Sequence, residues 1–338
     1  MSVYIIAEAG VNHNGDIELA KKLIDAAAEA GADAVKFQTF KAQKIVSHLA
    51  KKADYQLQTT GDQGGQLEML KRLELNREQH EILMAHCAGK EITFLSTPFD
   101  LESARMLRDM GMDTFKIPSG EITNLPLLRE LASYKASRYI ISTGVTELNE
   151  IRDVIQVFME NRIEKKMLTI LHCNTEYPSP FEDVNLKAML TIENEFKVDI
   201  GYSDHTLGIE VPIAAVAMGA KVIEKHFTLD NKMEGPDHQA SLEPAELKKM
   251  VSSIRNISKA LGSGVKTASK SEIKNKTAIR KSIVASRDIA KGEIFSSDNI
   301  TTKRPGNGIS PMLWDKVMGQ KASRNFNEDD LIELNSGV

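Results

Sequence analysis

Short apolar runs recur along the first two thirds of the chain, and each run ends in polar residues or glycine. Eight of them read as strands: VYIIAE (3–8), DAVKFQ (33–38), ITFLST (92–97), TFKIPS (114–119), YIISTG (139–144), LTILHC (168–173), VDIGYS (198–203) and KVIEKH (221–226). Apolar and β-branched runs of this length, bounded by turn residues, are typical of buried strands.

Amphipathic helical patterns lie between these runs. Six of them stand out: IELAKKLIDAAAEAG (17–31), DLESARMLRDMG (100–111), LPLLRELASY (125–134), ELNEIRDVIQVFMEN (147–161), NLKAMLTIENEF (185–196) and GIEVPIAAVAMGA (208–220). Gly31 and Gly111 are placed as left-handed helix ends before the next strand. Strand–helix alternation repeated eight times predicts an α/β fold of the (β/α)8 TIM-barrel type. The alternative, an open doubly wound sheet, would require a GxGxxG turn, and AEAGVNHNGD after the first strand lacks it.

One connection is longer than the others. About fifty residues separate VKFQTF from ITFLST, and they include KAQKIVSHLAKKADYQLQTTGDQGGQLEML (41–70). This segment would leave the second strand at the catalytic end of a barrel. We therefore expect a lid over the site.

The pattern changes after residue 262. Residues 1–262 read as the barrel, 263–279 as a polar linker, and 280–338 as a small module of short strands broken by Gly, Asn and Pro turns. The module contains TKRPGNGISP, with Arg304 at a turn. On the sequence alone, Arg304 reads as a solvated loop residue, although a docked module could bring it to the barrel mouth.

Composition narrows the class of protein. The 338 residues are 41% hydrophobic and 27% charged, which suits a folded globular chain, and the net charge of -4 argues against nucleic-acid binding. We find no apolar stretch of membrane-spanning length and no signal peptide, and Cys87 and Cys173 lack metal-ligand spacing. These features predict a cytoplasmic protein with free, buried thiols.

The predicted strand ends carry many polar residues, which would converge at one mouth of a barrel. Lys36 and Lys116 stand within strands, where an unpaired ammonium is costly. They could form ion pairs with Glu8 or Glu121, hold a phosphate or carboxylate together with nearby hydroxyl groups, or, less readily, form a Schiff base. His205 comes two residues after the seventh predicted strand, and His226 is the last residue of the eighth. Each could be an ordinary buried polar residue, but adjacent strand ends would let both reach one ion, which suits a catalytic divalent metal with open positions better than structural zinc.

The chain contains nine characteristic motifs: AEAGVNHNG, VKFQTF, STPF, KIPSGE, LHCNTEYP, GYSDHT, EKHFTLD, GPDH and TKRPGNGISP. Together they resemble motifs of the bacterial sialic acid synthases, a family that includes the legionaminate and pseudaminate synthases. The resemblance covers almost the whole chain. It implies a TIM barrel followed by an antifreeze-like (SAF) domain, in a homodimer where the SAF domain of one chain covers the barrel of the other. It also implies the condensation of phosphoenolpyruvate with an N-acetylated mannosamine-type sugar and water, with release of phosphate.

The resemblance also implies roles for individual residues. His205 and His226 would hold a divalent metal, Mn²⁺ first and Mg²⁺ or Co²⁺ as options, and Glu8 and Glu121 would be catalytic carboxylates. The residues expected to bind phosphoenolpyruvate are Lys36, Thr97, Lys116, Ser119, Thr175 and Ser203, and those expected to contact the sugar are Gln38, Tyr177, Asp237 and Arg304.

The identity of the sugar is the open point. Some family members carry an Asn where this chain has Thr175 in NTEYP, in a loop that faces the substrate. We favour N-acetylneuraminate synthase, acting on N-acetylmannosamine. The alternative is N,N′-diacetyllegionaminate synthase, acting on 2,4-diacetamido-2,4,6-trideoxymannose, with pseudaminate synthase third. Two readings outside the family, a non-catalytic carbohydrate-binding barrel and a Schiff-base aldolase, fit the combined metal and phosphate residues poorly.

Overall fold

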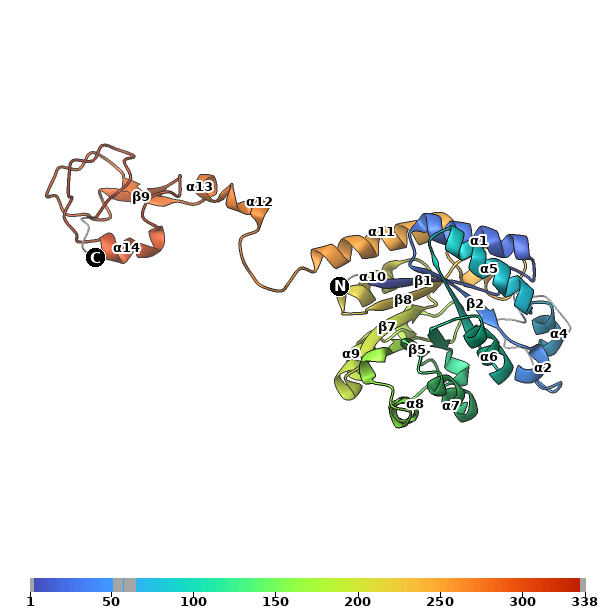
Figure 1. Cartoon of the computed structure of the whole chain (residues 1–338). Coiled ribbons are helices and arrows are strands. Elements are labelled where there is room, and N and C mark those ends of the chain that lie inside the picture. Colours follow the sequence, from blue (N-terminus) through green and yellow to red (C-terminus); the bar gives the residue numbers. More distant parts are fainter. Residues whose placement is uncertain (1–2, 51–56, 58–64, 335–338) are drawn as a thin grey trace. The chain divides into compact units, whose positions relative to one another are not determined.

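The computed structural model describes residues 3–50, 57 and 65–334, and the chain divides into two compact units, Met1–Gly262 and Ser263–Val338. The first unit is the barrel that the sequence predicted (Figure 1). Its eight parallel strands are β1 (Tyr4–Gly10), β2 (Ala34–Thr39), β3 (Thr93–Pro98), β4 (Thr114–Ile117), β5 (Arg138–Ser142), β6 (Leu168–His172), β7 (Asp199–Asp204) and β8 (Val222–His226).

The strands pair in the order β3-β2-β1-β8-β7-β6-β5-β4. The first and last strands of this order, β3 and β4, contact each other, so the barrel is nearly closed. Within the part of the chain that the structure describes, these two strands form no hydrogen-bonded ladder with each other. Closure brings the carboxyl ends of all eight strands to one mouth, and this positions the site.

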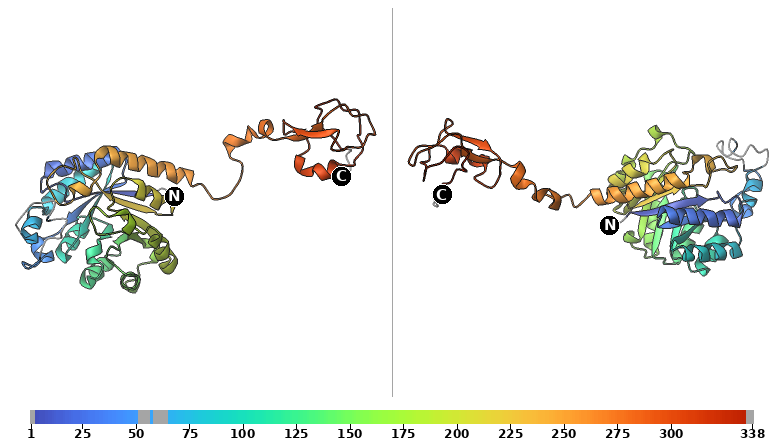
Figure 2. Two further views of the ribbon diagram at one scale, coloured as in Figure 1. Left: turned by 180° about the vertical axis from the view of Figure 1, so that it is seen from behind. Right: turned by 90° about the horizontal axis from the view of Figure 1, so that it is seen from above.

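Helices cover the outside of the barrel (Figure 2). They are α1 (Ile17–Ala30), α5 (Arg77–Gly89), α6 (Leu101–Asp109), α7 (Leu125–Ser133), α8 (Leu148–Glu160), α9 (Lys187–Phe196), α10 (Glu210–Ala217) and α11 (Pro244–Ala260). The short helices α2 (Ala42–Ile45) and α4 (Gln66–Lys71) lie in the connection between β2 and β3. Gly31 caps α1 at φ 81°, in the left-handed region predicted for it.

The sequence prediction omitted α2, α4, α5 and α11, and the first three of these helices correct our description of the long connection. Much of that connection is helical, because α2, α4 and α5 all lie between β2 and β3. Asn76 starts α5 with a capping box to Gln79, a signal present in the sequence. The buried face of α5 includes His80 and Cys87, so its apolar stripe was weak. The expected lid falls partly on residues 51–56 and 58–64, which lie outside the described residues.

Successive side chains along each strand point alternately out of and into the barrel, and they form two separate apolar layers. Ile5 and Ala7 of β1 point outward into the main core beneath the helices, whereas Ile6 points into the barrel. The inner layer consists of Ile6, Ala34, Leu95, Ile140, Leu171 and Val222. Because side chains alternate with a period of two, the residues two positions further on form the next layer toward the mouth.

The second unit has a core of its own. It begins with the short helices α12 (Lys270–Ile273) and α13 (Lys276–Ile279), which lie within the segment predicted to be a linker. The antiparallel pair β9 (Ser282–Ala285) and β10 (Ile300–Lys303) follows, with α14 (Trp314–Val317). Ile283, Phe295 and Phe326 are fully or almost fully buried in this core.

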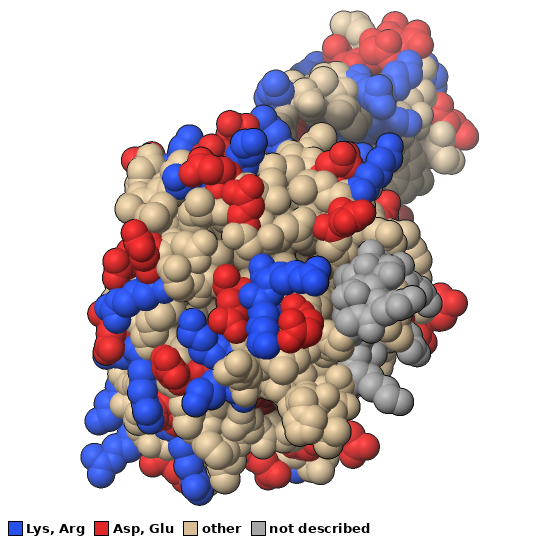
Figure 3. All heavy atoms as spheres, turned by 90° about the vertical axis from the view of Figure 1, so that its right-hand side faces the viewer, with Lys and Arg blue, Asp and Glu red and all other residues tan. Residues whose placement is uncertain are grey.

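The surface is consistent with the modest net charge. On the face shown in Figure 3, basic and acidic residues are interspersed, and no single sign dominates. Within the described residues, no helix has both the length and the apolar character needed to cross a membrane.

Candidate active site

A cavity of about 440 Å³ opens at the carboxyl ends of the barrel strands. Every predicted site residue except Arg304 lines it. These residues are Glu8, Lys36, Gln38, Thr97, Lys116, Ser119, Glu121, Thr175, Tyr177, Ser203, His205, His226 and Asp237. Strand alternation accounts for much of this convergence, because Glu8, Lys36 and Thr97 each stand two residues beyond a member of the inner apolar layer.

Two lysines and two glutamates form a buried chain of charges in this cavity. Lys36 Nζ lies 2.7 Å from Glu8 Oε2 and 3.7 Å from Glu224 Oε2, and Lys116 Nζ lies 3.2 Å from Glu224 Oε1. An ion pair between Lys36 and Glu8, one of the possibilities that the sequence left open, is present. Lys116 pairs with Glu224 rather than with Glu121, whose Oε2 instead accepts a hydrogen bond of 2.6 Å from Asn124.

The two glutamates of this buried chain of charges, Glu8 and Glu224, have very different pKa values. Burial raises the pKa of Glu8 to about 7, more than nearby Lys36 lowers it. Burial also acts to raise the pKa of Glu224, but the ammonium groups of Lys116 and Lys36 outweigh it and lower this pKa to about 2. Glu224 is therefore a fixed carboxylate, while Glu8 can gain or lose a proton near neutral pH. Such divergent pairs are typical of acid–base sites.

His205 and His226 lie together as expected, with ring centroids 5.4 Å apart. His205 Nδ1 is 2.6 Å from the carbonyl oxygen of Asn174, so Nε2 is the nitrogen left for a ligand. His226 Nδ1 is buried without a hydrogen-bond partner. Burial lowers the pKa of His205 to about 4, so the ring is neutral at pH 7, the form that binds metals. These features fit a divalent metal, although no group of three or more His, Cys, Asp or Glu residues suited to a metal occurs within the described ranges.

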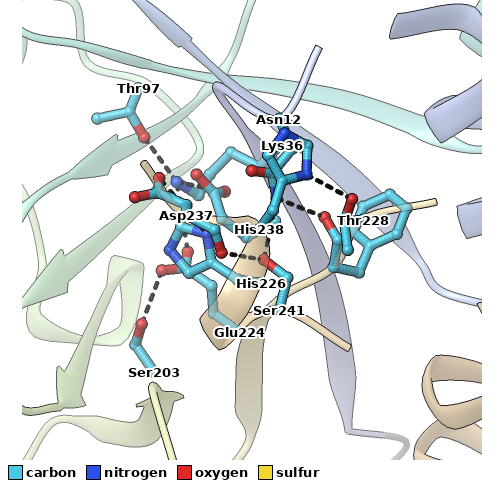
Figure 4. Close-up of polar contacts among 12 residues, drawn as sticks. Asn12, Lys36, Thr97, Ser203, Glu224, His226, Thr228, Asp237, His238 and Ser241 are labelled. Atoms are coloured by element: carbon cyan, nitrogen blue, oxygen red, sulfur yellow. Dashed lines mark hydrogen bonds and ion pairs between the residues drawn. The ribbon is translucent and has the colours of Figure 1, made fainter. Parts of the chain in front are cut away.

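Asp237 is held at the cavity by the loop after β8. Asn12 Nδ2 donates to the Phe227 carbonyl at 2.9 Å and to Ser241 Oγ at 3.0 Å, and Ser241 Oγ donates to the Asp237 carbonyl at 2.7 Å (Figure 4). The Asp237 carboxylate thereby lies 4.0 Å from His226 Nδ1. Asn12, the first of the two asparagines in the AEAGVNHNG motif, thus has a positioning role that the sequence did not indicate.

The predicted hydroxyl groups surround the charged chain. Thr97 Oγ1 accepts from Lys36 at 2.9 Å, and Ser203 Oγ donates to Glu224 at 2.8 Å (Figure 4). Ser119 Oγ accepts from the Gly144 amide at 2.9 Å. A Cβ at Gly144 would lie 2.5 Å from Thr175 Cγ2, so glycine is needed for this close approach.

A second buried ion pair lies between the strands that carry the two histidines. Lys225 Nζ is 2.5 Å from Asp204 Oδ2 and also donates to the Thr206 carbonyl, and both charged side chains are fully buried. Lys225 stands between Glu224 and His226, and Asp204 precedes His205. The pair therefore ties the end of β7 to the end of β8.

Three features of the cavity were not anticipated from the sequence. Glu224 was among the polar strand-end residues but had no predicted role, and Cys173 lines the cavity besides being buried. An apolar group, which includes Phe40 and Phe99, also lines the cavity and was not anticipated. Arg304 belongs to the second unit, where its Nε donates to the Ile279 carbonyl at 3.1 Å.

Comparison with known proteins agrees with this architecture. The NeuB family model matches residues 23–266, and the SAF domain model matches residues 280–335. The chain is 57% identical to N,N′-diacetyllegionaminic acid synthase of Campylobacter jejuni, over 97% of this chain and 98% of that protein. It is 48% identical to the enzyme of the same name from Legionella pneumophila, over 96% of this chain and 92% of that protein.

A solved structure is also similar. The crystal structure of N-acetylneuraminic acid synthetase from Leptospira borgpetersenii, in complex with citrate, is 36% identical, with a TM-score of 0.71 over 81% of this chain and 90% of that one. The family match spans well over half of the chain, and the relatives align along nearly all of it. The chain therefore belongs to the NeuB family and carries a SAF domain after its barrel.

Proposed function

We propose that this enzyme condenses phosphoenolpyruvate with 2,4-diacetamido-2,4,6-trideoxymannose and water, giving N,N′-diacetyllegionaminate and phosphate. One observation carries the chemical part of this proposal. The charged chain Glu8–Lys36–Glu224–Lys116 lines the same cavity as the neutral pair His205 and His226. Anion-binding cations and metal-binding imidazoles in one cavity suit a reaction between an anionic enol phosphate and an aldehyde.

The lysines would hold phosphoenolpyruvate. Lys36 and Lys116 supply positive charge for its phosphate and carboxylate, and buried charge-assisted hydrogen bonds are strong. Thr97 and Ser119 accept hydrogen bonds from protein groups, so their hydroxyl hydrogens can turn toward the ligand. Thr175 and Ser203 are the other two hydroxyl residues proposed to contact phosphoenolpyruvate. The Ser203 hydroxyl, which donates to Glu224, would turn toward the ligand to donate to it.

The imidazoles would hold Mn²⁺, with Mg²⁺ or Co²⁺ as alternatives. Such a metal would act as a Lewis acid toward the open-chain aldehyde of the sugar. The unpartnered His226 Nδ1 and the orientation of His205 by the Asn174 carbonyl support this assignment. The sugar itself would be bound by Gln38, Tyr177 and Asp237.

Glu8 is the proposed base. In the reaction, C3 of phosphoenolpyruvate attacks the aldehyde carbon, water adds at C2, and phosphate leaves when the C2–O bond breaks. The two protons of the water end on the former aldehyde oxygen, which becomes a hydroxyl, and on the departing phosphate. A carboxylate with a pKa of about 7 can take the proton that the water gives up at C2, since efficient bases have a pKa near the working pH. Glu224 would stay ionised and hold Lys36 and Lys116 in place, and Glu121 is a second carboxylate in the same cavity.

The choice of sugar follows from the relatives. Sequence motifs alone favoured N-acetylmannosamine, but the relative that is 57% identical bears the name of a diacetyllegionaminic acid synthase. We therefore place the diacetamido sugar first and N-acetylmannosamine second. We also propose, from the family resemblance, a homodimer in which the SAF domain of one chain brings Arg304 to the sugar of the other.

Phosphate release from phosphoenolpyruvate tests the proposal. With Mn²⁺, 2,4-diacetamido-2,4,6-trideoxymannose should be the better substrate, and EDTA should abolish release. Preference for N-acetylmannosamine would keep the chemistry and overturn the sugar assignment. No release with either sugar, in a protein that folds and binds Mn²⁺, would overturn the proposed reaction.

A further inference from the structure

One part of the cavity is apolar. Val11, Phe40, Ile45, Met69, Leu70 and Phe99 line it and pack against one another as a cluster distinct from the barrel cores. We call these six residues the apolar wall. A cluster of this size, facing a cavity otherwise lined by charged and hydroxyl groups, indicates contact with an apolar part of a ligand.

The apolar wall is held in place by its surroundings. The rings of Phe40 and Phe99 meet edge to face, with centroids 6.2 Å apart. The amide of Ala42 donates to Glu74 Oε1 at 2.7 Å, and this bond ties the segment after β2 to the chain that follows α4. On the other side, a Cβ at Gly15 would lie 2.4 Å from the Arg72 carbonyl, so the end of α4 packs tightly against the β1–α1 loop.

The apolar wall lies toward the outside of the mouth. Lys36 and Thr97 stand within β2 and β3, whereas Phe40 and Phe99 each follow directly after the last residue of the same two strands. Side chains beyond the strand ends lie further along the barrel axis than those within the strands. The charged chain therefore occupies the deeper part of the cavity.

This arrangement orients the sugar, if the proposed function holds. The aldehyde carbon C1 must meet C3 of phosphoenolpyruvate, which the deep lysines hold. The other end of the sugar, from C4 to C6, must then point outward. We propose that the apolar wall is the subsite for this end and takes the C6 methyl and the C4 acetamido methyl of the diacetamido sugar.

The same subsite would disfavour N-acetylmannosamine, which carries hydroxyl groups at both C4 and C6. The six side chains of the apolar wall offer no oxygen or nitrogen atom to such hydroxyls. A hydroxyl that loses water without gaining a hydrogen bond weakens binding, whereas a methyl group gains from burial. The apolar wall would therefore set the preference between the two sugars rather than the rate of the chemistry.

Two wall variants and one control test this inference. Leu70→Asn and Ile45→Thr each place a polar group on the apolar wall at little change in size. Leu148→Asn, on α8, alters a leucine that is 40% exposed and does not line the cavity. For each protein, kcat/KM is measured with both sugars at saturating phosphoenolpyruvate and Mn²⁺, and the KM for phosphoenolpyruvate is measured separately.

The specificity ratio is kcat/KM for the diacetamido sugar divided by kcat/KM for N-acetylmannosamine. In both wall variants we expect this ratio to fall about tenfold or more. The control should keep the wild-type ratio, and the KM for phosphoenolpyruvate should not change. If folded wall variants keep the wild-type ratio, the inference is wrong while the proposed function stands. If the wild-type enzyme itself prefers N-acetylmannosamine, the proposed sugar is wrong and the inference fails with it. Should Leu70→Asn misfold, Ile45→Thr gives the same decision.

Discussion

The buried pair between Lys225 and Asp204 gives a sharp test of how burial governs an ion pair. Lys225→Met keeps most of the length of the side chain but leaves the Asp204 carboxylate buried without its ammonium partner. Removing one member of a buried ion pair destabilises proteins by about 3–5 kcal/mol. We expect a loss of free energy of unfolding within that range.

The same two strands supply a matched control. Lys221 Nζ and Asp199 Oδ1 are also 2.5 Å apart, but their side chains are 44% and 39% exposed. Exposed pairs contribute about 0.2–1 kcal/mol, so Lys221→Met should cost no more than about 1 kcal/mol. The two variants thus compare equal ion-pair distances at different burial.

The assay is urea denaturation followed by two signals. Far-UV circular dichroism reports mainly the helices of the barrel, whereas Trp314, the only tryptophan of the chain, reports the second unit by fluorescence. Lys225→Met should shift the first transition and leave the second in place. Adding Asp204→Asn to Lys225→Met should recover part of the loss, because it removes the unpaired charge. If Lys225→Met cost no more than Lys221→Met, the reasoning from burial would be refuted.

Three further predictions concern the site. His226→Ala should abolish phosphate release and weaken Mn²⁺ binding while leaving the far-UV spectrum unchanged; wild-type turnover of this variant in EDTA would exclude a metal role. Arg304→Ala should raise the KM for the sugar more than the KM for phosphoenolpyruvate in steady-state assays, and equal increases would contradict a sugar contact. Burial raises the pKa of Glu8 from 4.5 to about 7, so folding favours its protonated form. This stabilisation is complete below pH 4.5 and is lost as pH rises through 7, a change of about 3 kcal/mol. In metal-free protein, the stability difference between wild type and Glu8→Gln, measured by urea denaturation, should therefore change by this amount between pH 4.5 and 8, and a constant difference would contradict the shift.

Sequence patterns predicted the barrel because its strands are short apolar runs ending in polar residues, and its first helix ends at Gly31 as expected. The helix α5 was not predicted because a histidine and a cysteine occupy its buried face, which made the periodic pattern of apolar residues weak. Its capping box, Asn76 with Gln79, was the available signal.

The site was predictable where it follows from strand ends and less so where it depends on contacts between strands. Lys36 was found because charge within an apolar run is conspicuous, and His226 because it and His205 come at or just after the ends of successive predicted strands. The pairing of Lys116 with Glu224 depends on how far β4 and β8 are staggered around the barrel, which no local pattern contains. The apolar wall was missed because Met69 and Leu70 look like ordinary core residues until their positions in space are known.

The division of the cavity into a deep charged part and an outer apolar part has a consequence for how such an enzyme can change. Most of the groups proposed to bind phosphoenolpyruvate are built into barrel strands, namely Lys36, Thr97, Lys116 and Ser203. Much of the apolar wall stands on the segment between β2 and α5, outside the strands. If the apolar wall binds the sugar as proposed, mutation there would change the substrate and leave the reaction unaltered, so exchange of a few side chains on one ancestral barrel would give a new sugar acid. Relatives that share the barrel yet bear the names of different sugar acids are what this division of labour would produce.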